Sequence, residues 1–412
     1  MLKDWTILIY ANGNNEFEPE MYRLFLDSQK IKPNNNINVV IQIGREKREL
    51  VNILRPEDTL IETNDNWTGV RRFCLELNGI DKYFKATLIK DLGNVNMADP
   101  KNLYEFVRWG LLNYPSKKTL LMLGGHSFQY LGIMTDYSQD LPYIMGIPEM
   151  ARALNLLKKN SGRNIDILVL DTCYMNMVEI LYELAKEKKH CVKNILTYIE
   201  YGPIGGLPID QLINIIIENI NQEDEKLLLA KIIDELDFDL VAFNLSHKKL
   251  ERIKRLTNDL AKLLANGQNK EMSLADILET DVTKDNPLFS EITNLQKYFK
   301  ELLIYAKRVS NQKSWLLDIA HKSTSNKLAA YYTRLCFTKN NYWTKILGVE
   351  SLKEGLNFEE SVQLKPLVLP LQALTSLIGV MNHTANDEEL QIILYNLLEY
   401  KKWHRFSNVL LK

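Results

Sequence analysis

Short apolar runs alternate with segments of helical periodicity along the first ~205 residues. Runs of strand length end in Gly, Asn, Asp or charged residues, and they lie at Trp5–Tyr10, Asn38–Ile43, Ala86–Ile89, Leu120–Leu123, Ile165–Leu170 and Asn194–Ile199. Apolar positions with helical spacing lie between several of them, at Glu18–Gln29, Asn102–Leu112, Pro148–Lys158 and Met175–Lys186. This alternation is typical of a parallel sheet with crossover helices on both faces. The pattern therefore predicts an α/β layered domain built on largely buried strands.

Two parts of the chain depart from this alternation. Leu50–Leu54 and Thr59–Thr63 are close together and favour an antiparallel pair of strands. After Pro208 the pattern becomes mostly helical, with helices predicted at Asp210–Asn221, Asp224–Glu235, His247–Ala265, Phe289–Val309 and Asp387–Tyr400. Strands are predicted there only at Leu240–Leu245 and Pro366–Leu369, and the Asp- and Thr-containing stretch Asn266–Asp285 is predicted as a loop.

Composition excludes several classes of protein. The 412 residues are 46% hydrophobic, which is ample for a core, and a formal net charge of −1 gives no reason to expect nucleic acid or an anionic membrane as a partner. The longest apolar runs, such as Leu212–Ile217, fall well short of the ~18 residues that a membrane span needs. The start of the chain has no apolar signal core, so we expect a cytoplasmic protein. The alternative is a secreted form whose signal has been removed.

The cysteines and histidines are scattered. Four cysteines (Cys74, Cys173, Cys191 and Cys336) form no CxxC pair, which favours free thiols in a reducing compartment over a disulfide framework. Six dispersed histidines show no zinc-ligand spacing. For three of the cysteines we expect the role of a small buried apolar residue. Cys173 is the exception because of its place in the pattern.

His126 and Cys173 each follow directly on a predicted buried strand. His126 comes after the run Thr119–Gly125, and Cys173 stands 47 positions later, after Ile165–Thr172. The carboxyl ends of parallel strands share one edge of a sheet, where open α/β sheets place their sites. A thiol with an imidazole nearby is the arrangement of a cysteine nucleophile. The helical pattern that follows Cys173 also predicts a helix start there, which lowers a thiol pKa and leaves a backbone N–H for an oxyanion.

These residues resemble the clostripain family of cysteine peptidases, in the caspase-like clan. The similarity covers about residues 4–265 and lies in four segments. They are the opening Trp5-Thr6 strand with its turn at Asn12–Glu16, the Gly-His at 125–126, the Leu-Asp-x-Cys-x-Met of 170–175 with Val178-Glu179, and the Pro- and Gly-containing acidic loop at 198–208.

The resemblance implies a caspase-like α/β/α sandwich with a mainly parallel central sheet at 1–265. Beyond it, the helical pattern predicts a mostly helical extension of unknown role at 266–412. The resemblance also implies a cysteine endopeptidase with a catalytic dyad of His126 and Cys173. The oxyanion hole would be formed by the backbone N–H groups of Ser127 and Cys173. Because family members that cleave after Arg or Lys line their S1 pocket with acidic residues, Asp171 and Glu200 are the predicted substrate-binding residues.

Three departures from the family pattern concern the substrate side of the site. Ser127 stands where the family usually has Gly, the turn after the histidine is Phe128-Gln129-Tyr130, and Gly202-Pro203 replaces the usual Glu-Pro. They leave a second reading open, a catalytically degenerate caspase-like interaction or regulatory module.

For the active peptidase we expect a protein or peptide substrate, no nucleic acid or membrane partner, and no cofactor. Calcium dependence, known in some relatives, stays open, and the sequence has no EF-hand loop. A regulatory partner for the C-terminal region stays open as well.

Overall fold

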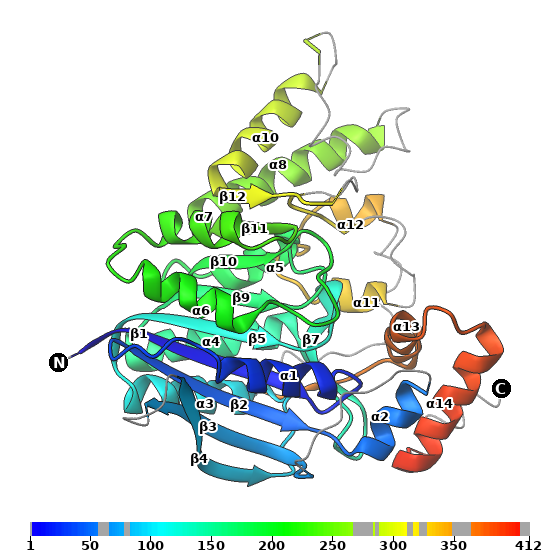
Figure 1. The fold of residues 1–412 in the computed structure, drawn as a ribbon. Helices are drawn as coiled ribbons and strands as arrows, with labels where there is room; N and C mark the ends of the chain where they lie inside the picture. Colours follow the sequence, from blue (N-terminus) through cyan, green and yellow to red (C-terminus); the bar gives the residue numbers. More distant parts are fainter. Residues whose placement is uncertain are drawn as a thin grey trace.

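The structure, a computed structural model, describes residues 2–56, 66–77, 83–266, 283–284, 288–310, 316–320, 328–347 and 364–403. Its centre is a nine-stranded sheet with helices on both faces, and a small four-stranded sheet lies beside it (Figure 1). The predicted caspase-like α/β class with a mainly parallel central sheet is confirmed.

Five strands in the middle of the large sheet are parallel. They lie in the order β10-β9-β5-β1-β2. Their bounds are Lys3–Gly13 (β1), Ile37–Arg45 (β2), Ser116–Gly124 (β5), Ile165–Asp171 (β9) and Val192–Tyr198 (β10). They are apolar runs because helices cover both their faces. After β2 the chain returns to β5 on the other side of β1, so the topological switch point lies between β1 and β5.

Antiparallel strands extend the sheet at both edges. On one side are β3 (Gly69–Leu77) and β4 (Phe84–Gly93), and on the other β11 (Leu240–Asn244) and β12 (Leu303–Lys307). The sequence pattern did not predict β3. The run at Ala86–Ile89, predicted as a buried strand, lies in β4, a mostly exposed edge strand.

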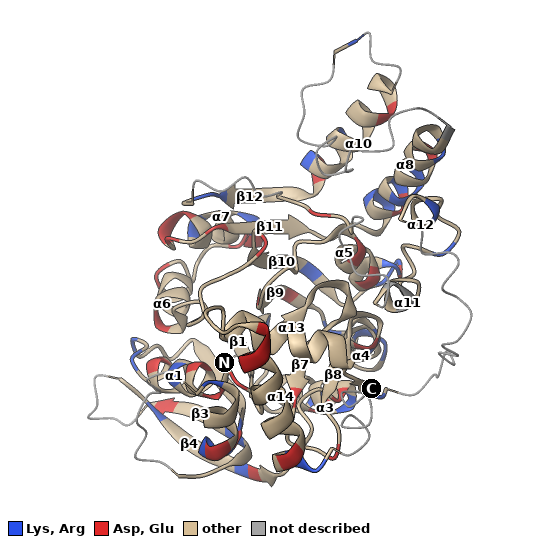
Figure 2. Cartoon of the chain, turned by 90° about the vertical axis from the view of Figure 1, so that its right-hand side faces the viewer, with Lys and Arg blue, Asp and Glu red and all other residues tan. Residues whose placement is uncertain are grey.

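Each face of the large sheet has its own apolar core. One core is formed with helices α3 (Pro100–Asn113), α4 (Ile147–Ser161), α5 (Val178–Ala185) and α8 (His247–Asn266). The other is formed with α1 (Glu18–Ser28), α6 (Ile209–Glu218) and α7 (Glu225–Glu235). Lys, Arg, Asp and Glu are interspersed over the outer elements (Figure 2).

The small sheet begins directly after His126. Its strands are β6 (Ser127–Phe128), β7 (Gly132–Asp136), β8 (Tyr143–Gly146) and β13 (Leu367–Val368), in the order β13-β8-β7-β6. Of these the sequence predicted only β13, as part of Pro366–Leu369, and it did not predict β6, β7 or β8.

Two sequence predictions are wrong in part. Leu50–Leu54, predicted as a strand, belongs to helix α2 (Arg48–Leu54), which buries Leu50, Val51 and Leu54 on one face. Short apolar runs do not distinguish helix from strand by period alone. The helix predicted over Phe289–Val309 ends at Leu302 as α10 (Phe289–Leu302), and the chain continues as edge strand β12. Thr59–Thr63 and most of Asn266–Asp285 lie outside the described residues.

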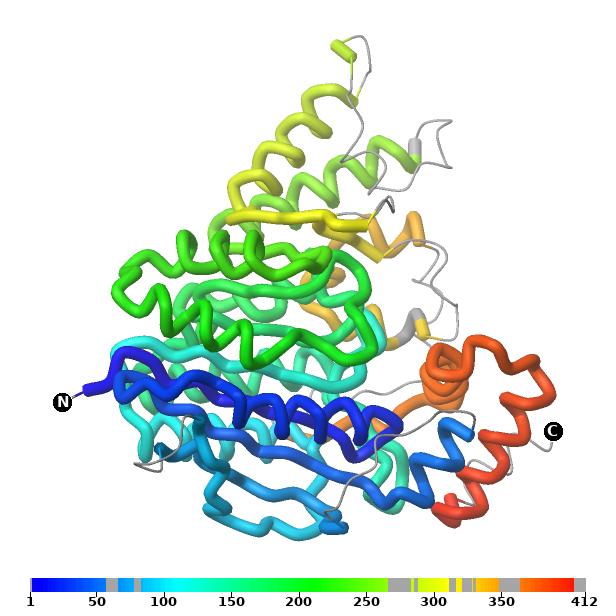
Figure 3. The backbone as a smooth tube through the Cα atoms, in the orientation of Figure 1, coloured from blue at the N-terminus to red at the C-terminus, as the bar shows by residue number. Residues whose placement is uncertain are grey.

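The region after residue 265 is mostly helical where it is described, but it also adds to both sheets. Its helices are α10, α11 (Ala329–Tyr332), α12 (Trp343–Ile346), α13 (Leu371–Met381) and α14 (Asp387–Lys401). Strand β12 extends the central sheet, β13 extends the small sheet, and α14 packs against α2 (Figure 3). The buried Glu179 of α5 accepts hydrogen bonds from the Ala320 N–H (3.0 Å) and the Tyr332 hydroxyl (2.7 Å). The boundary at 265 stays a prediction, and residues beyond it share the core of those before it.

In the described part of the chain, no helix combines the length and apolar character needed to cross a membrane.

Candidate active site

His126 and Cys173 follow neighbouring parallel strands. Strands β5 and β9 pair in register up to Gly124 and Asp171, and each of the two reactive residues stands two positions further on. The Ser127 hydroxyl donates a hydrogen bond to the Cys173 carbonyl oxygen at 2.6 Å, which ties the two loops together. The placement predicted for the thiol and the imidazole, beyond the carboxyl ends of adjacent strands, is confirmed. The serine that replaces the usual glycine has a structural partner.

The turn before His126 requires glycine. Gly125 has φ +151°, a backbone conformation that side chains disfavour, and a Cβ there would lie 3.2 Å from the Asn12 carbonyl oxygen. The close approach lets the histidine loop pack on the loop after β1. His126 is buried at 5% exposure, and its ring packs against that of Phe17 in a tilted arrangement, with centroids 4.6 Å apart.

Cys173 does not stand at a helix start, so this part of the sequence interpretation is wrong. Tyr174 has φ +57°, which interrupts the helical pattern, and α5 begins only at Val178. The Val178 N–H donates to the Asp318 carbonyl oxygen at 2.9 Å, so this first amide of the helix is occupied away from the thiol. The helix dipole therefore does not lower the pKa of this thiol.

The thiol of Cys173 is protonated more firmly than an ordinary thiol. Burial raises its pKa, a hydrogen bond from the Gly202 backbone lowers it, and the nearby Asp171 carboxylate raises it again, with burial the largest influence. All four cysteines are free, and Cys173 is half-buried, whereas Cys74 and Cys191 are buried. A thiol in this state needs a base to become a nucleophile.

Asp171 lies beneath the Cys173 loop, with 4% of its surface exposed. Its Oδ1 accepts hydrogen bonds from the Tyr198 hydroxyl (2.6 Å) and the Leu207 N–H (3.0 Å). Its Oδ2 is buried and has no hydrogen-bond partner among the described residues. A Cβ at Gly206, which has φ +70°, would lie 2.7 Å from that oxygen, so glycine is needed there. Burial raises the pKa of Asp171 to about 6, against the lowering influence of these hydrogen bonds.

Glu200 is brought to the Cys173 loop through its backbone. It follows β10, has φ +70° and is half-buried. Its carbonyl oxygen accepts from the Tyr174 N–H, and its own N–H donates to Asn176 Oδ1 at 3.3 Å. The loop after β10 and the Cys173 loop are thus bound to each other.

Sequence reasoning missed one neighbour of His126. Glu16 is fully buried, and its Oε1 lies 3.2 Å from His126 Nε2. It follows β1, which pairs with β5 on the side opposite β9. The signal was present in the polar turn after the first buried strand, but the sequence does not show that β1 and β5 are neighbours.

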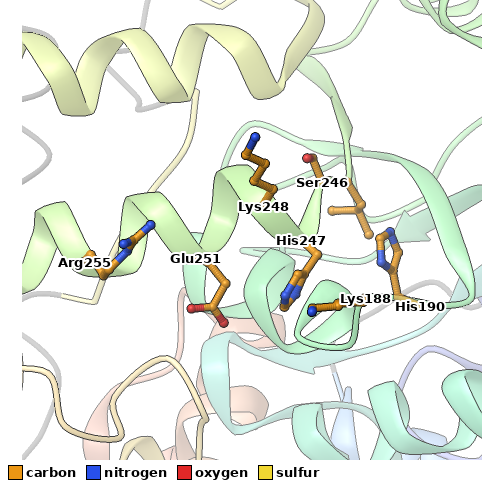
Figure 4. A pocket seen from close by; sticks show the side chains of 8 residues that line it. Lys188, His190, Ser246, His247, Lys248, Glu251 and Arg255 are labelled. Atoms are coloured by element: carbon orange, nitrogen blue, oxygen red, sulfur yellow. The ribbon is translucent and has the colours of Figure 1, made fainter.

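A hollow of about 610 Å³ is lined by Lys188, His190, Leu245, Ser246, His247, Lys248, Glu251 and Arg255 (Figure 4). These residues precede β10 or follow β11, at the edge of the sheet opposite Cys173. Although it gathers basic side chains, this hollow is not part of the Cys–His site. No cluster of three or more His, Cys, Asp or Glu suited to a metal ion occurs among the residues that the structure describes.

Known proteins resemble this chain in sequence and in fold. The model of the clostripain family, peptidase C11, matches residues 25–370. An inactive zymogen C11 protease from Parabacteroides distasonis is similar in structure, with a TM-score of 0.58 and 14% identity over 83% of this chain and 99% of that one. A secreted C11 cysteine protease from Bacteroides thetaiotaomicron, in complex with an irreversible peptide inhibitor, is also similar in structure. Its TM-score is 0.57 and its sequence identity 12%, over 83% of this chain and 99% of that one. These likenesses show a shared fold, and no curated protein matches the sequence.

Proposed function

The chain belongs to the clostripain family of cysteine peptidases, and we propose that Cys173 and His126 form the catalytic dyad with which it hydrolyses peptide bonds within a chain. The observation that carries this proposal is the position of the two residues, each two positions past paired residues of β5 and β9. In this arrangement an imidazole and a thiol share the carboxyl edge of the sheet beside its switch point.

The chemistry follows from the state of the thiol. Because burial raises the thiol pKa, His126 acts as the base that takes the proton from Cys173 Sγ. The thiolate attacks the scissile carbonyl carbon, and the N–H groups of Ser127 and Cys173 hold the resulting oxyanion. The C–N bond breaks as the imidazolium gives its proton to the leaving amine. Water then attacks the thioester with His126 as base, which releases the acid and restores the thiol.

Cleavage after Arg or Lys is the specificity that we propose. Asp171 offers a buried carboxylate oxygen without a hydrogen-bond partner among the described residues, and a guanidinium or ammonium would supply both the charge and the donor. Glu200, from the loop that borders the thiol, is proposed as the second acidic group. The substrate is then a protein or peptide with an exposed basic residue. The cytoplasmic location and a regulatory partner for the C-terminal region stay predictions.

Alkylation of the thiols tests the dyad. We expect iodoacetamide at neutral pH to modify Cys173 faster than Cys74, Cys191 or Cys336, because an adjacent imidazole supplies thiolate. The His126→Ala variant should slow this reaction by about tenfold or more. The sites and rates are read by mass spectrometry. Equal rates with and without His126, together with no peptide hydrolysis, would favour the degenerate interaction module instead.

Asp171→Asn is expected to stabilise the protein at neutral pH. Its folded-state pKa of about 6 lies above the unfolded value of about 3.9, so the folded state holds the proton more tightly. That advantage is present below pH ~4 and is lost as the pH rises through ~6. At pH 7.5 the isosteric amide avoids an ionisation that costs up to ~3 kcal/mol. Thermal unfolding should show a higher Tm at pH 7.5 and little change at pH 4, and an unchanged Tm at pH 7.5 would contradict the burial argument.

A further inference from the structure

Glu16 is a buried carboxylate that the proposed mechanism does not use. None of its surface is exposed, and neither of its oxygens makes a well-directed hydrogen bond among the described residues. The same is true of His126 Nε2, which lies 3.2 Å from Glu16 Oε1, at hydrogen-bond distance although the geometry is not ideal. A buried carboxylate without a compensating charge or donor is strongly disfavoured. The imidazole and the Tyr137 hydroxyl, which also adjoins the carboxylate, are the groups placed to compensate it, and of the two only the imidazole can supply a positive charge.

The order of the strands places Glu16 behind the histidine. Strand β5 has β9 on one side and β1 on the other, and Ala11, Gly124 and Asp171 share one row of the sheet. The loops after these three strands carry Glu16, His126 and Cys173, respectively. The imidazole therefore comes from the strand between the one that supplies the thiol and the one that supplies the carboxylate. One ring nitrogen faces the carboxylate, which leaves the other for the thiol.

The loop that carries Glu16 is held rigidly. The side-chain amides of Asn12 and Asn15 each donate to the Thr135 carbonyl oxygen at 2.7 Å. The Phe17 N–H donates to Asn15 Oδ1 at 2.8 Å, and the Phe17 ring packs on the imidazole. A carboxylate fixed in this way keeps its position while the histidine changes protonation state, as a preorganised site requires.

Two other ionisable groups adjoin Glu16. Burial raises the pKa of Tyr137, and the Glu16 carboxylate raises it further, so this phenol stays neutral over the working pH range. The Arg55 guanidinium donates to the Glu16 carbonyl oxygen at 3.1 Å and pairs with Glu20 at 2.9 Å. The Arg55 guanidinium thus contacts the backbone of Glu16 and forms an ion pair with the Glu20 carboxylate.

We propose that Glu16 is a positioning residue that orients His126 and stabilises its protonated form, so that Cys173, His126 and Glu16 work as a triad. This inference rests on the proposed dyad. A carboxylate at Nε2 keeps a proton on that nitrogen and leaves the Nδ1 lone pair to accept the thiol proton. When the imidazolium forms, its positive charge is balanced in a buried site.

Glu16→Gln tests this role, because the amide keeps the size and loses the charge. For a fluorogenic peptide with Arg before the cleaved bond we expect kcat to fall about 10- to 100-fold with little change in KM. The acid limb of the pH profile of kcat/KM should move to lower pH by about 1 unit or more, because His126 must be unprotonated to act as the base and an opposite charge at this distance favours its protonated form. Glu16→Asp, which retains the charge, should restore part of this shift.

A readout without turnover uses the Cys173→Ala background. The His126 ring signal, assigned by its loss in His126→Ala, is titrated by NMR with Glu16 and with Gln at position 16. The midpoint should move to lower pH by about 1 unit or more when the charge is removed. Glu18→Gln is the matched control, because Glu18 is a buried carboxylate two positions away that pairs with Arg45 Nε at 2.6 Å. It should leave both the pH limb and the His126 midpoint in place.

The outcomes separate this inference from the dyad itself. An unchanged His126 midpoint and pH profile in Glu16→Gln, with Cys173→Ala inactive, would overturn the role of Glu16 and leave the dyad standing. Full activity in Cys173→Ala would instead remove the proposed function. A lower Tm in Glu16→Gln without the pH shift would identify a structural role alone and would also overturn the inference.

Discussion

Cys173→Ala is expected to abolish peptide hydrolysis, lowering kcat by at least about 10³-fold while the fold is retained. Loss of a nucleophile typically removes several orders of magnitude in rate, because no other group forms the covalent intermediate. The change deletes one sulfur at a half-buried position in a loop, so the effect on the Tm should be small. Hydrolysis of a fluorogenic peptide by the purified full chain measures the loss.

Cys191→Ala is the control for that experiment. Cys191 is a buried free thiol just before β10, at the opposite edge of the sheet from Cys173. Its removal should leave kcat/KM within about twofold of the wild type, because it contributes packing alone. If Cys173→Ala kept more than a few per cent of the wild-type turnover, Cys173 would not be the nucleophile.

The second large effect concerns specificity. We expect kcat/KM to favour Arg or Lys over Leu before the cleaved bond by about 30- to 1000-fold, which corresponds to ~2–4 kcal/mol. The reason is the buried Oδ2 of Asp171, which has no hydrogen-bond partner in the part of the chain that the structure describes, in a site dry enough to raise the pKa of this carboxyl to about 6. Asp171→Ala should remove most of the preference. The KM for the Arg substrate should rise as the pH falls through ~6, where the carboxylate becomes protonated.

Asp166→Asn provides a matched control on the same strand. Asp166 is buried at the amino end of β9, where its Oδ1 pairs with Lys193 at 2.5 Å and its Oδ2 accepts from the Thr119 N–H at 2.8 Å. It should change the Tm and leave the Arg:Leu ratio alone. An unchanged Arg:Leu ratio in Asp171→Ala would show that Asp171 does not recognise the basic side chain. Faster cleavage after Leu than after Arg in the wild type would contradict the proposed preference for basic residues.

The sequence carried enough information for the parallel core of the fold and for the two reactive residues. Buried strands such as β5 and β9 are continuous apolar runs because both faces are covered, so the change to Gly-Gly-His and Asp-Thr-Cys marks their ends sharply. The edge strand β12 is only partly buried, and β3, next to the edge strand β4, contains two consecutive arginines and ends exposed, so neither gives a continuous apolar run. This difference explains why the five parallel strands were predicted and β3 and β12 were not.

Other features depended on the tertiary structure. The sequence pattern predicts a helix that begins at Met175. In the structure Tyr174 has a left-handed backbone and α5 begins only at Val178, so the helix dipole does not act on the Cys173 thiol. Burial, which depends on the packed loops around Cys173, then decides the direction of the thiol pKa. The pairing of β1 with β5 is a contact between residues more than a hundred positions apart, and it alone brings Glu16 to His126. Local sequence therefore determined which side chains end the strands, whereas sheet order and burial decided which of them meet and in what protonation state.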